Sequence, residues 1–583
     1  MLKNLFSWLE QRTGLGAVFG RIGETPLPGG ARWGRTFGTA AVVFLLLEML
    51  TGLGLGAWYS PSTTGAWASV NYVQTQLTLG WLLRGLHHVG GNALIVLVLL
   101  HLAQMMIWGA YRAPRELTWI TGLLAMQVLL VVSHTGFLLP WDLRAYWATQ
   151  VLVGIAGNQP LVGQMAQEVI QGGPVVGNAT LTHLYAAHVL VMPGAVLTLI
   201  ALHAWLRAKH PAAYPPKLSD ADAGEKAQSY FPHQFVRDLG VSAVVLAGIV
   251  IYLVREHGIE LGAPADPAIE YVARPEWYFY PVFHLRHWFT GSLEFIATSA
   301  LPGVAVALLC ALPFLAKRLD ARFKRTDEFL KVLIGLGAIA TVMLGVSTAA
   351  EDASDDKANK MNEAAAKIAL EQQRLAAIGV PVTGPLDLYR NDPLVWGKRV
   401  FNRECSPCHK DPNMKNFDGT SPVMQGYASR AWLKRFLRDP HGPFFFGNTK
   451  GIDEMDSFDG SDEKLDALTE YLYAEGKRTD ANSELVDRGK TIYAEEGCDQ
   501  CHSMDGEGTG DAPDLKGFAT EEWLTAFIRK PSADRFYGKL NEMDEFDGDK
   551  LGKDELAVVV AYLRDRTGDR LSFAAPPNSK VDP

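Results

Sequence analysis

Long hydrophobic stretches alternate with shorter polar connections over the first 349 residues of the chain. A helix needs about 20 apolar residues to cross the hydrocarbon core of a bilayer. Seven stretches meet that requirement, at residues 37–58, 86–108, 117–138, 183–206, 235–254, 293–315 and 330–348. The pattern therefore predicts an all-α fold with seven membrane-spanning helices in this part of the chain.

The residues after 349 are polar and begin with an acidic stretch that contains EDASDDK. The segment that follows is rich in Ala, Glu, Lys and Gln, a composition that favours a helix. Gly379–Pro385 are expected to end that helix. We interpret residues 350–385 as a linker that contains one helix.

An internal repeat with a period of about 91 residues follows the linker. GKRVFNRECSPCH matches GKTIYAEEGCDQCH, WLKRFLRDP matches WLTAFIRKP, and EMDSFDG matches EMDEFDG. Each copy then continues into a Leu-rich helical pattern that ends in Tyr-Leu. The repeat predicts two small helical domains, at residues 386–478 and 479–583.

Basic residues gather at the N-terminus and in the connections after the second, fourth and sixth predicted spans. The other connections are poorer in Lys and Arg, although Arg144, Arg274 and Arg286 lie there. The positive-inside rule then predicts a cytoplasmic N-terminus. With seven spans, the polar tail and the connection between spans five and six both lie on the opposite, periplasmic side.

Composition excludes some functions. The chain is 48% hydrophobic with a net charge of −9, and this acidic balance argues against nucleic-acid binding. Four of the five Cys belong to two CxxCH motifs, and Cys310 lies alone in an apolar stretch, so a disulfide framework is not expected. No cleavable signal peptide is visible, and residues 1–30 are interpreted as an amphipathic helix on the membrane surface.

Two predicted spans carry paired histidines. His87 and His101 lie fourteen residues apart in the second span, and His188 and His203 lie fifteen apart in the fourth. Each pair spans about 21–22 Å along a helix and points to a similar face. A lone His in an apolar helix is usually a hydrogen-bonded core residue. The paired spacing instead predicts two haems stacked across the membrane, because ionisable residues at this depth are usually functional.

Paired glycines support the same interpretation. Gly38 and Gly52 lie fourteen residues apart in the first span, as do Gly122 and Gly136 in the third. A haem plane against a helix requires a missing side chain at each level. Close packing of helices through small residues is the alternative, but the shared spacing of His and Gly favours haem.

The CxxCH motif is the attachment signal for c-type haem. The two motifs supply Cys405, Cys408 and His409, and Cys498, Cys501 and His502. A zinc knuckle or a redox-active Cys pair is the alternative. Zinc would require two further ligands in each unit, and only His441 is left over in the tail.

The repeat also offers a second iron ligand at matching positions, Met455 and Met543. Ligation by His and Met gives haem a relatively high potential, which suits an electron acceptor. Met504 follows the second motif too closely to reach the opposite haem face, and Met414 and Met424 are weaker candidates in the first unit.

Four motifs occur in the order RGLHHVGG, GFLLPWDLRAYW, GGPVVGNATLTHLYAAH and RPEWYFYPVF. On these motifs the first 349 residues resemble the cytochrome b/b6 family, the membrane core of quinol:cytochrome c oxidoreductases. The resemblance implies a four-helix haem bundle at 31–215 and a three-helix part at 216–349. The tail is similar to a tandem class I cytochrome c.

The resemblance also implies the haem ligands. It pairs His87 with His188 toward the periplasmic face, and His101 with His203 on the other haem. His88 is an alternative to His87, which the position of Arg84 favours, and Arg84 is expected at the haem. The fifteen-residue gap resembles the plastoquinol branch, which holds an extra haem on a Cys. Thr36 occupies that position, so no third covalent haem is predicted.

Glu276 lies among aromatic residues on the side where protons leave, and such a carboxylate tends to have a raised pKa. The resemblance implies that Glu276 accepts a proton at a quinol-oxidising site, with Tyr278 and Pro140–Asp142 nearby. His134 either adjusts this pocket or has a structural role.

A second quinone site is expected on the cytoplasmic side. Asp238, in YFPHQFVRDLG, matches an acid that contacts quinone at the reducing site of the family. The alternative is that Asp238 pairs with the basic residues that follow the positive-inside rule, such as Arg207 and Lys209.

The resemblance implies a bacterial cytoplasmic-membrane complex, expected as a homodimer, in which quinol oxidation sends one electron through the b haems to quinone. The other electron reaches the c haems through a Rieske protein on a separate chain, because all four paired Cys belong to CxxCH. Lipid and a downstream cytochrome c or oxidase are further expected partners. The alternatives are an electron-relay cytochrome of a dehydrogenase complex, or the same complex reducing quinone in reverse.

Overall fold

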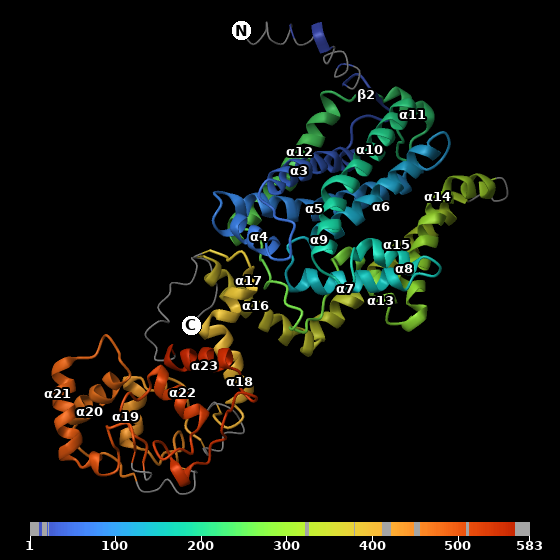
Figure 1. Cartoon of the computed structure of the whole chain (residues 1–583). Helices are drawn as coiled ribbons and strands as arrows, with labels where there is room; N and C mark the ends of the chain where they lie inside the picture. Colours follow the sequence, from blue (N-terminus) through green and yellow to red (C-terminus); the bar gives the residue numbers. More distant parts are fainter. Residues whose placement is uncertain are drawn as a thin grey trace. The chain divides into compact units, whose positions relative to one another are not determined.

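The computed structural model of the chain describes residues 8, 11–13, 20, 23–320, 326–377, 379–410, 421–447, 455–508 and 512–565. The chain divides into two compact units, Met1–Pro385 and Leu386–Pro583 (Figure 1). Met414 and most of the N-terminal surface helix predicted within residues 1–30 lie outside the described residues.

Seven helices among the described residues are long and apolar enough to cross a membrane. They are Trp33–Gly56, Gly80–Ile107, Glu116–Leu138, Asn178–Lys209, His233–Glu256, Gly291–Asp320 and Glu328–Ser354. The prediction of an all-α fold with seven spans is therefore confirmed. In Figure 1 they correspond to α3 (Thr36–Gly56), α5 (Gly80–Ile107), α6 (Glu116–Leu138), α9 (Asn178–Ala186) with α10 (Met192–Lys209), α12 (His233–Glu256), α14 (Leu301–Asp320) and α15 (Thr326–Ser354).

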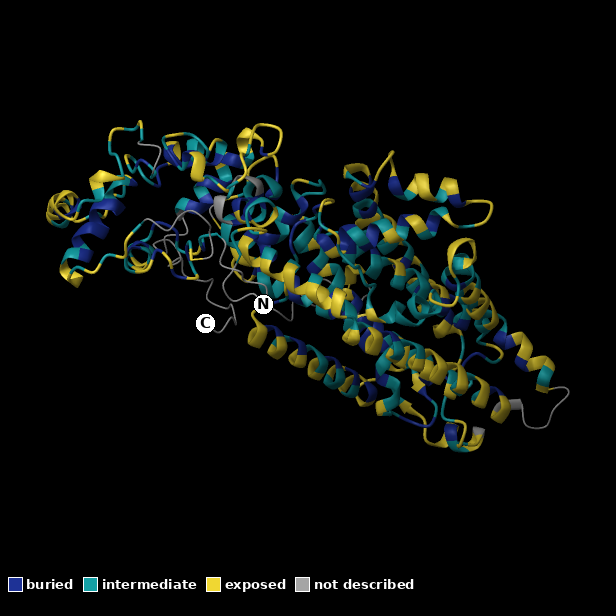
Figure 2. Cartoon of the chain, turned by 90° about the horizontal axis from the view of Figure 1, so that it is seen from below, coloured by how far each residue is buried: buried dark blue, intermediate teal, exposed yellow. Residues whose placement is uncertain are grey.

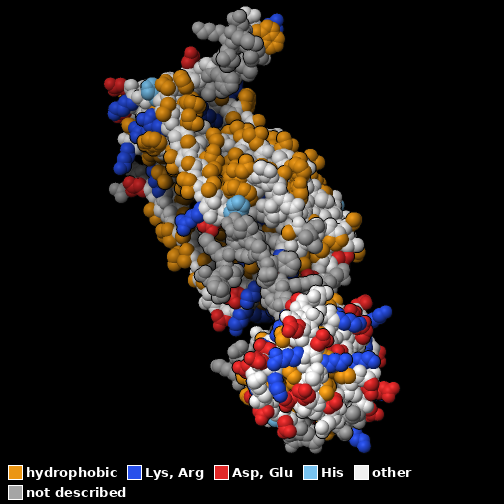
Figure 3. Space-filling model, turned by 90° about the vertical axis from the view of Figure 1, so that its left-hand side faces the viewer, with side chains coloured by type: hydrophobic (Ala, Val, Ile, Leu, Met, Phe, Trp, Pro, Cys, Tyr) orange, Lys and Arg blue, Asp and Glu red, His pale blue; other side chains and the backbone are white. Residues whose placement is uncertain are grey.

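The outer faces of these helices expose large apolar side chains, among them Leu50, Leu53 and Val244. Figure 2 shows these exposed faces as long bands along the helices, and Figure 3 shows a largely hydrophobic surface over the bundle. The smaller unit instead presents many Lys, Arg, Asp and Glu side chains in Figure 3. Such a broad apolar surface matches contact with lipid.

Helix pairs build the centre of the bundle. Helix α3 packs against α5, α6 packs against α10, and α12 covers both α3 and α5. The core between them includes Phe44, Leu94, Val196 and Leu253. This packing brings the spans that carry paired histidines next to the spans that carry paired glycines.

Shorter elements join the spans. They are β1 (Pro26–Leu27) paired antiparallel with β2 (Gln228–Ser229), α4 (Ala66–Thr75), α7 (Leu143–Gly157), α8 (Gly163–Gln171), α11 (Asp220–Glu225), η3 (Trp277–Phe279) and α13 (Tyr280–Leu285). The sixth span itself begins with η4 (Gly291–Leu293) and η5 (Ile296–Ala300) before α14. The segment predicted as a linker contains α16 (Asp356–Ala376), in which Ile368 and Ala369 pack against Leu143 and Ala263.

The second unit is a set of short helices. They are α17 (Pro385–Asn391), η6 (Pro393–Gly397), α18 (Lys398–Glu404), α19 (Arg430–Arg438), α20 (Asp462–Glu475), α21 (Ser483–Glu495), η7 (Cys498–Gln500), α22 (Glu521–Arg529), η8 (Gly538–Leu540) and α23 (Lys553–Asp565). Ser429 and Thr520 cap α19 and α22 at matching places of the repeat, since each side chain accepts a backbone N–H of its helix.

The first and last helices of the two repeats are exchanged within this unit. A Cβ atom at Gly397, just before α18, would lie 2.5 Å from Cβ of Tyr562 in α23. At Gly489 in α21, the corresponding atom would lie 2.7 Å from Cβ of Tyr471 in α20. The first helix of each repeat therefore packs on the last helix of the other repeat.

Two hydrophobic cores follow from this exchange. One joins residues 400–428 with residues 519–563, and the other is built from residues 433–493. The structure thus differs from the predicted division at 478/479, because that boundary falls between α20 and α21, which pack closely together. A sequence repeat identifies equivalent helices but not which copies pack on each other.

Candidate functional site

The four paired histidines face the interior of the bundle from α5 on one side and from the fourth span on the other. The rings of His87 and His188 lie 6.1 Å apart between centroids and are perpendicular. His203 lies close enough to His101 for the two imidazoles to interact electrostatically. The neighbouring His88 is exposed. The structure thus brings together the pairs that the resemblance implies, although their role as iron ligands stays a prediction.

Each of the four predicted glycines lies against one of these imidazoles. A Cβ atom would come within 2.9 Å of Cε1 of His101 at Gly38, 3.0 Å of His87 at Gly52, 3.0 Å of His203 at Gly122 and 2.5 Å of His188 at Gly136. Any larger residue would displace the imidazole. The glycines therefore make room for the histidine rings, which close helix packing alone does not require.

Hydrogen bonds at Nδ1 hold three of the four rings in place. The hydroxyl of Thr51 donates to the Leu47 carbonyl and lies 3.0 Å from Nδ1 of His87, so it accepts the Nδ1 hydrogen. Nδ1 of His188 donates to the carbonyl of Val132 at 3.0 Å, and Nδ1 of His203 donates to that of Thr118 at 2.9 Å. These bonds leave Nε2 as the nitrogen available to a metal.

Sequence reasoning missed this set of supporting residues, although a signal was present. Thr precedes three of the four glycines, at Thr51, Thr121 and Thr135, and the last two lie 3.4 and 3.3 Å from Nδ1 of His203 and His188. Glu48, one turn before Gly52, places Oε2 3.1 Å from Nδ1 of His87. A carboxylate within an apolar span was also a visible signal.

A local widening of the helix explains the fifteen-residue spacing in the fourth span. Residues Ala187–Val191 form a π-helical turn, η2, that contains His188. A π turn takes in one residue more than an α turn. The extra residue brings His188 back to the face that carries His203, so both spans present two histidines to the same interior.

Glu276 begins η3 in the connection between the fifth and sixth spans. Burial raises the pKa of the Glu276 carboxyl above its usual range, and the positive charge of Arg144 partly opposes that shift. A half-buried carboxyl with a raised pKa beside one cation is able to take up and release a proton. Burial and the charge of Arg144 thus define the environment of Glu276, and its role as a proton acceptor stays a prediction.

The residues after Glu276 attach this loop to α5 and α6. Trp277 Nε1 donates to Asn92 Oδ1 in α5 at 2.8 Å, and the Tyr278 hydroxyl donates to Ser133 Oγ in α6 at 2.8 Å. The ring of Phe279 meets the ring of His134 at 5.4 Å between centroids. His134 therefore lies at the edge of the predicted quinol site.

The Pro140–Asp142 segment also lies beside this connection. Asp142 forms an isolated antiparallel β-bridge with Pro264, and the Trp141 carbonyl accepts a hydrogen bond from the Ala265 N–H at 3.1 Å. Asp142 also accepts the Ala145 N–H and so starts α7, which carries Arg144. This segment is thereby joined to the same loop that carries Glu276.

Asp238 is buried in α12 and both of its oxygens are hydrogen-bonded. Tyr230 donates to Oδ2 at 2.9 Å and Gln234 donates to Oδ1 at 2.7 Å. Lys209 is instead positioned over the ring of Trp205. The described contacts of Asp238 are therefore neutral donors, not the paired basic residues of the alternative interpretation.

Arg84 is buried, and its guanidinium donates to Gln74 Oε1 and to the carbonyls of Ile259 and Glu260. These bonds tie α5 to the segment after α12. The structure shows this structural role, and the predicted contact with haem stays a prediction.

The two CxxCH histidines have matching environments. Nδ1 of His409 donates to the Pro422 carbonyl at 2.8 Å, and Nδ1 of His502 donates to the Pro513 carbonyl at 2.9 Å. Burial lowers the pKa of both imidazoles, which keeps them neutral and ready to bind iron.

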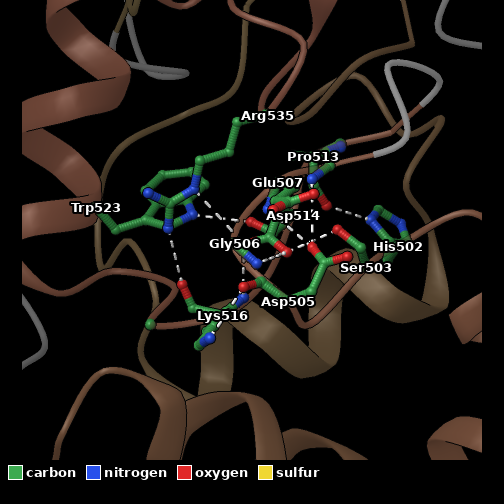
Figure 4. A network of polar contacts seen from close by, with 12 residues as sticks. His502, Ser503, Asp505, Gly506, Glu507, Pro513, Asp514, Lys516, Trp523 and Arg535 are labelled. Carbon is green, nitrogen blue, oxygen red and sulfur yellow. Dashed lines mark hydrogen bonds and ion pairs between the residues drawn. The ribbon is translucent and has the colours of Figure 1, made fainter.

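A buried carboxylate organises the loop after His502 (Figure 4). Asp514 is fully buried and accepts bonds from Ser503 Oγ at 2.6 Å and from the Gly506 N–H at 3.0 Å. Its own carbonyl accepts the Trp523 indole N–H at 2.8 Å. This network fixes Pro513 and thereby the orientation of the His502 ring.

Each candidate methionine lies in a hydrophobic core that contains residues from both repeats. Met543, from the second repeat, packs in the core that contains Cys405 of the first repeat. Met455, from the first repeat, packs in the core that contains Cys498 of the second. The weaker candidate Met424 borders the first of these cores, and Met504, which follows the second motif too closely to reach the opposite haem face, borders the second.

His441 has a different role from the zinc ligand considered above. Its Nε2 donates to the carbonyl of Met455 at 2.8 Å. The donor set of each motif is then two Cys, one neutral His and a nearby thioether, which fits covalent haem better than zinc.

Comparison with known proteins identifies the family of each part of the chain. Residues 92–266 match the family described as cytochrome b(N-terminal)/b6/petB. The chain is 35% identical over 211 residues to the menaquinol:cytochrome c reductase cytochrome b subunit of Bacillus subtilis, covering 35% of this chain and 94% of that protein. The chain belongs to the cytochrome b/b6 family. Residues 486–567 match the cytochrome c family, so a cytochrome c domain follows the cytochrome b part.

Two further relatives show the range of the family. The chain is 30% identical over 202 residues to cytochrome b6 of Mastigocladus laminosus, covering 35% of this chain and 94% of that protein. It is 33% identical over 251 residues to the cytochrome bc complex cytochrome b subunit of Chlorobaculum thiosulfatiphilum, covering 43% of this chain. The match spans 58% of the length of that relative.

Proposed function

We propose that the chain is the electron-carrying core of a quinol:cytochrome c oxidoreductase. Glu276 would accept protons from a quinol, two b haems held by the bundle would supply one-electron transfer toward a second quinone site, and a separate Rieske protein would connect the quinol site to two c haems. Relatives named as menaquinol:cytochrome c reductase and cytochrome bc complex subunits support this function.

One observation carries the proposal. The loop that contains Glu276 is hydrogen-bonded to Asn92 and Ser133. Asn92 lies five residues after His87 in α5, about 7.5 Å along the helix, and Ser133 lies three residues before Gly136 in α6. The loop of the proton-accepting carboxyl is therefore attached to α5, which carries His87, and to α6, whose Gly136 lies against His188.

The proposed haem ligands are His87 with His188 and His101 with His203. Haem iron, when bound there, supplies reversible one-electron transfer. The chain keeps the Nδ1 atoms of three of these histidines occupied by hydrogen bonds, and its glycines keep side chains away from all four rings. This arrangement orients the imidazoles before the cofactor binds.

At the quinol site, the carboxyl of Glu276 takes the proton that leaves with each electron. A hydrogen bond to Ser133 holds the Tyr278 hydroxyl in place, and the positive charge of Arg144 stabilises the ionised carboxylate of Glu276. At the second site, Asp238 with Tyr230 and Gln234 forms a hydrogen-bonded set that is suited to supply protons to a reduced quinone.

The remaining features of the proposal concern the whole complex. The membrane is the bacterial cytoplasmic membrane, with the N-terminus on the cytoplasmic side and the c haems on the periplasmic side. The complex is a homodimer that delivers electrons to a soluble cytochrome c or an oxidase. The high potential expected of His–Met ligation supports this forward direction over the reverse.

Replacing Glu276 with Gln is expected to slow quinol oxidation by about 100-fold, the lower end of what a positioned proton acceptor contributes. Only the ionised carboxyl accepts a proton. Because burial raises the pKa, wild-type turnover should rise with pH through a value above the usual range of Glu, about 4.3. The Gln variant should lose that rise. Steady-state cytochrome c reduction at a series of pH values measures both effects.

The matched control is Glu270→Gln, which changes another carboxyl in the same connection. Both variants should retain wild-type haem content, so that a loss of turnover reports on chemistry and not on assembly. Turnover of Glu276→Gln equal to that of Glu270→Gln at every pH would remove Glu276 from the mechanism.

A further inference from the structure

Two histidines and one glutamate meet just after the Glu276 loop. His284 lies in α13, His287 lies two residues beyond its end, and Glu351 lies in the last turn of α15. One ligating atom from each residue lies within 4.8 Å of the other two. The two helices are also joined by the Thr348 hydroxyl, which donates to the Tyr280 carbonyl at 3.0 Å.

The distances within this cluster match a metal site. Oε2 of Glu351 lies 3.5 Å from Nδ1 of His284 and 3.4 Å from Nδ1 of His287. Ligands about 2.0–2.1 Å from a tetrahedral zinc ion lie about 3.3 Å from one another. Both distances are therefore close to the distance between two ligand atoms of the same zinc ion.

His284 gives independent evidence of a missing partner. Its side chain is only 12% exposed, and Nδ1 is buried with no hydrogen-bond partner among the described residues. Buried ring nitrogens are normally satisfied. The Glu351 carboxylate lies 3.5 Å from this nitrogen without forming a hydrogen bond, and a cation between the two groups would satisfy the nitrogen.

The surrounding charges leave Glu351 available. Arg274 pairs with Asp352 at 2.5 Å and with Asp355 at 3.2 Å. Arg286 pairs with Glu294 at 2.5 Å. The neighbouring carboxylates and guanidiniums thus neutralise one another, while the ion-pair partners of Glu351 among the described residues are the two imidazoles.

We propose that His284, His287 and Glu351 bind one zinc ion, with water in the fourth position. Two imidazoles and one carboxylate are a known zinc donor set. The bound ion joins α13 to α15 and so anchors the helix that directly follows the Glu276 loop. The site lies beyond the RPEWYFYPVF motif and is independent of the haem sites.

The test uses the purified full-length complex after dialysis against a chelator, which does not remove haem. Zinc is added in steps, unbound metal is removed by gel filtration, and retained zinc is measured by mass spectrometry. The wild type should retain one more zinc per chain than Glu351→Gln or His287→Ala. Both changed side chains are about half exposed, so haem content should stay at the wild-type level.

His233→Ala is the matched control, because His233 is an exposed histidine of another helix, and it should retain as much zinc as the wild type. X-ray absorption of the retained zinc should show two imidazole ligands. Equal retention by the wild type and Glu351→Gln would overturn the proposal, as would an equal loss in the His233 control.

Discussion

Gly52→Val is expected to remove one of the two proposed b haems from the chain. A Cβ atom at Gly52 would lie 3.0 Å from Cε1 of His87, and the two further methyl groups of valine would enter the space of the ring. The imidazole would have to leave the position in which Thr51 and Glu48 hold its Nδ1. Non-covalent haem should fall from about two to about one per chain in a pyridine haemochrome measurement.

Helix α3 provides its own control for this experiment. Gly56 lies one turn beyond Gly52, and a Cβ atom there meets nothing within 4 Å. Gly56→Val should therefore keep both b haems. Gly136→Val should remove the same haem as Gly52→Val, because Gly136 contacts His188. Full haem content in Gly52→Val would show that the glycine serves helix packing only.

Replacing each candidate methionine with leucine should show that the iron ligands of each c haem come from both repeats. In a variant that keeps only the second c haem, made with Cys405→Ser and Cys408→Ser, Met455→Leu is expected to lower the potential of that haem. Met455 shares a core with Cys498, and loss of a thioether ligand lowers the potential. Redox titration of the c haem absorbance measures the change.

Met543→Leu in the same background is the matched control and should leave that potential unchanged, because Met543 packs with Cys405. The reciprocal background, with Cys498→Ser and Cys501→Ser, should show the reverse dependence. If Met543 instead controlled the second haem, each repeat would hold its own ligands, as the predicted division at 478/479 implies.

Much of the membrane part could be predicted because its constraints are local. A span is visible as an apolar run of sufficient length, and the His and Gly pairs recur at one spacing that a helix converts into two levels. The predicted pairs His87–His188 and His101–His203 are neighbours in the structure. The PEWY motif identified the loop at Glu276, whose contacts with Asn92 and Ser133 only the structure shows.

The features that could not be predicted depend on how distant segments pack. The π turn at Ala187–Val191 corrects the position of His188 by one residue, which periodicity alone does not reveal. The partners of Gly397 and Gly489 are about equally plausible helices of two similar repeats, so only packing decides between them. The meeting of His284 with Glu351 joins the connection before the sixth span to the end of the seventh span, two positions that the sequence separates by 67 residues.

Acid–acetone extraction of the purified complex, followed by haem quantification in both fractions, tests the central claim that one chain carries four haems of two kinds. The account predicts two extractable haems per chain, held by the bundle, and two haems that stay attached to the chain at Cys405–Cys408 and Cys498–Cys501. Fewer than two extractable haems per chain, or a haem that stays attached to a peptide from residues 1–349, would contradict it.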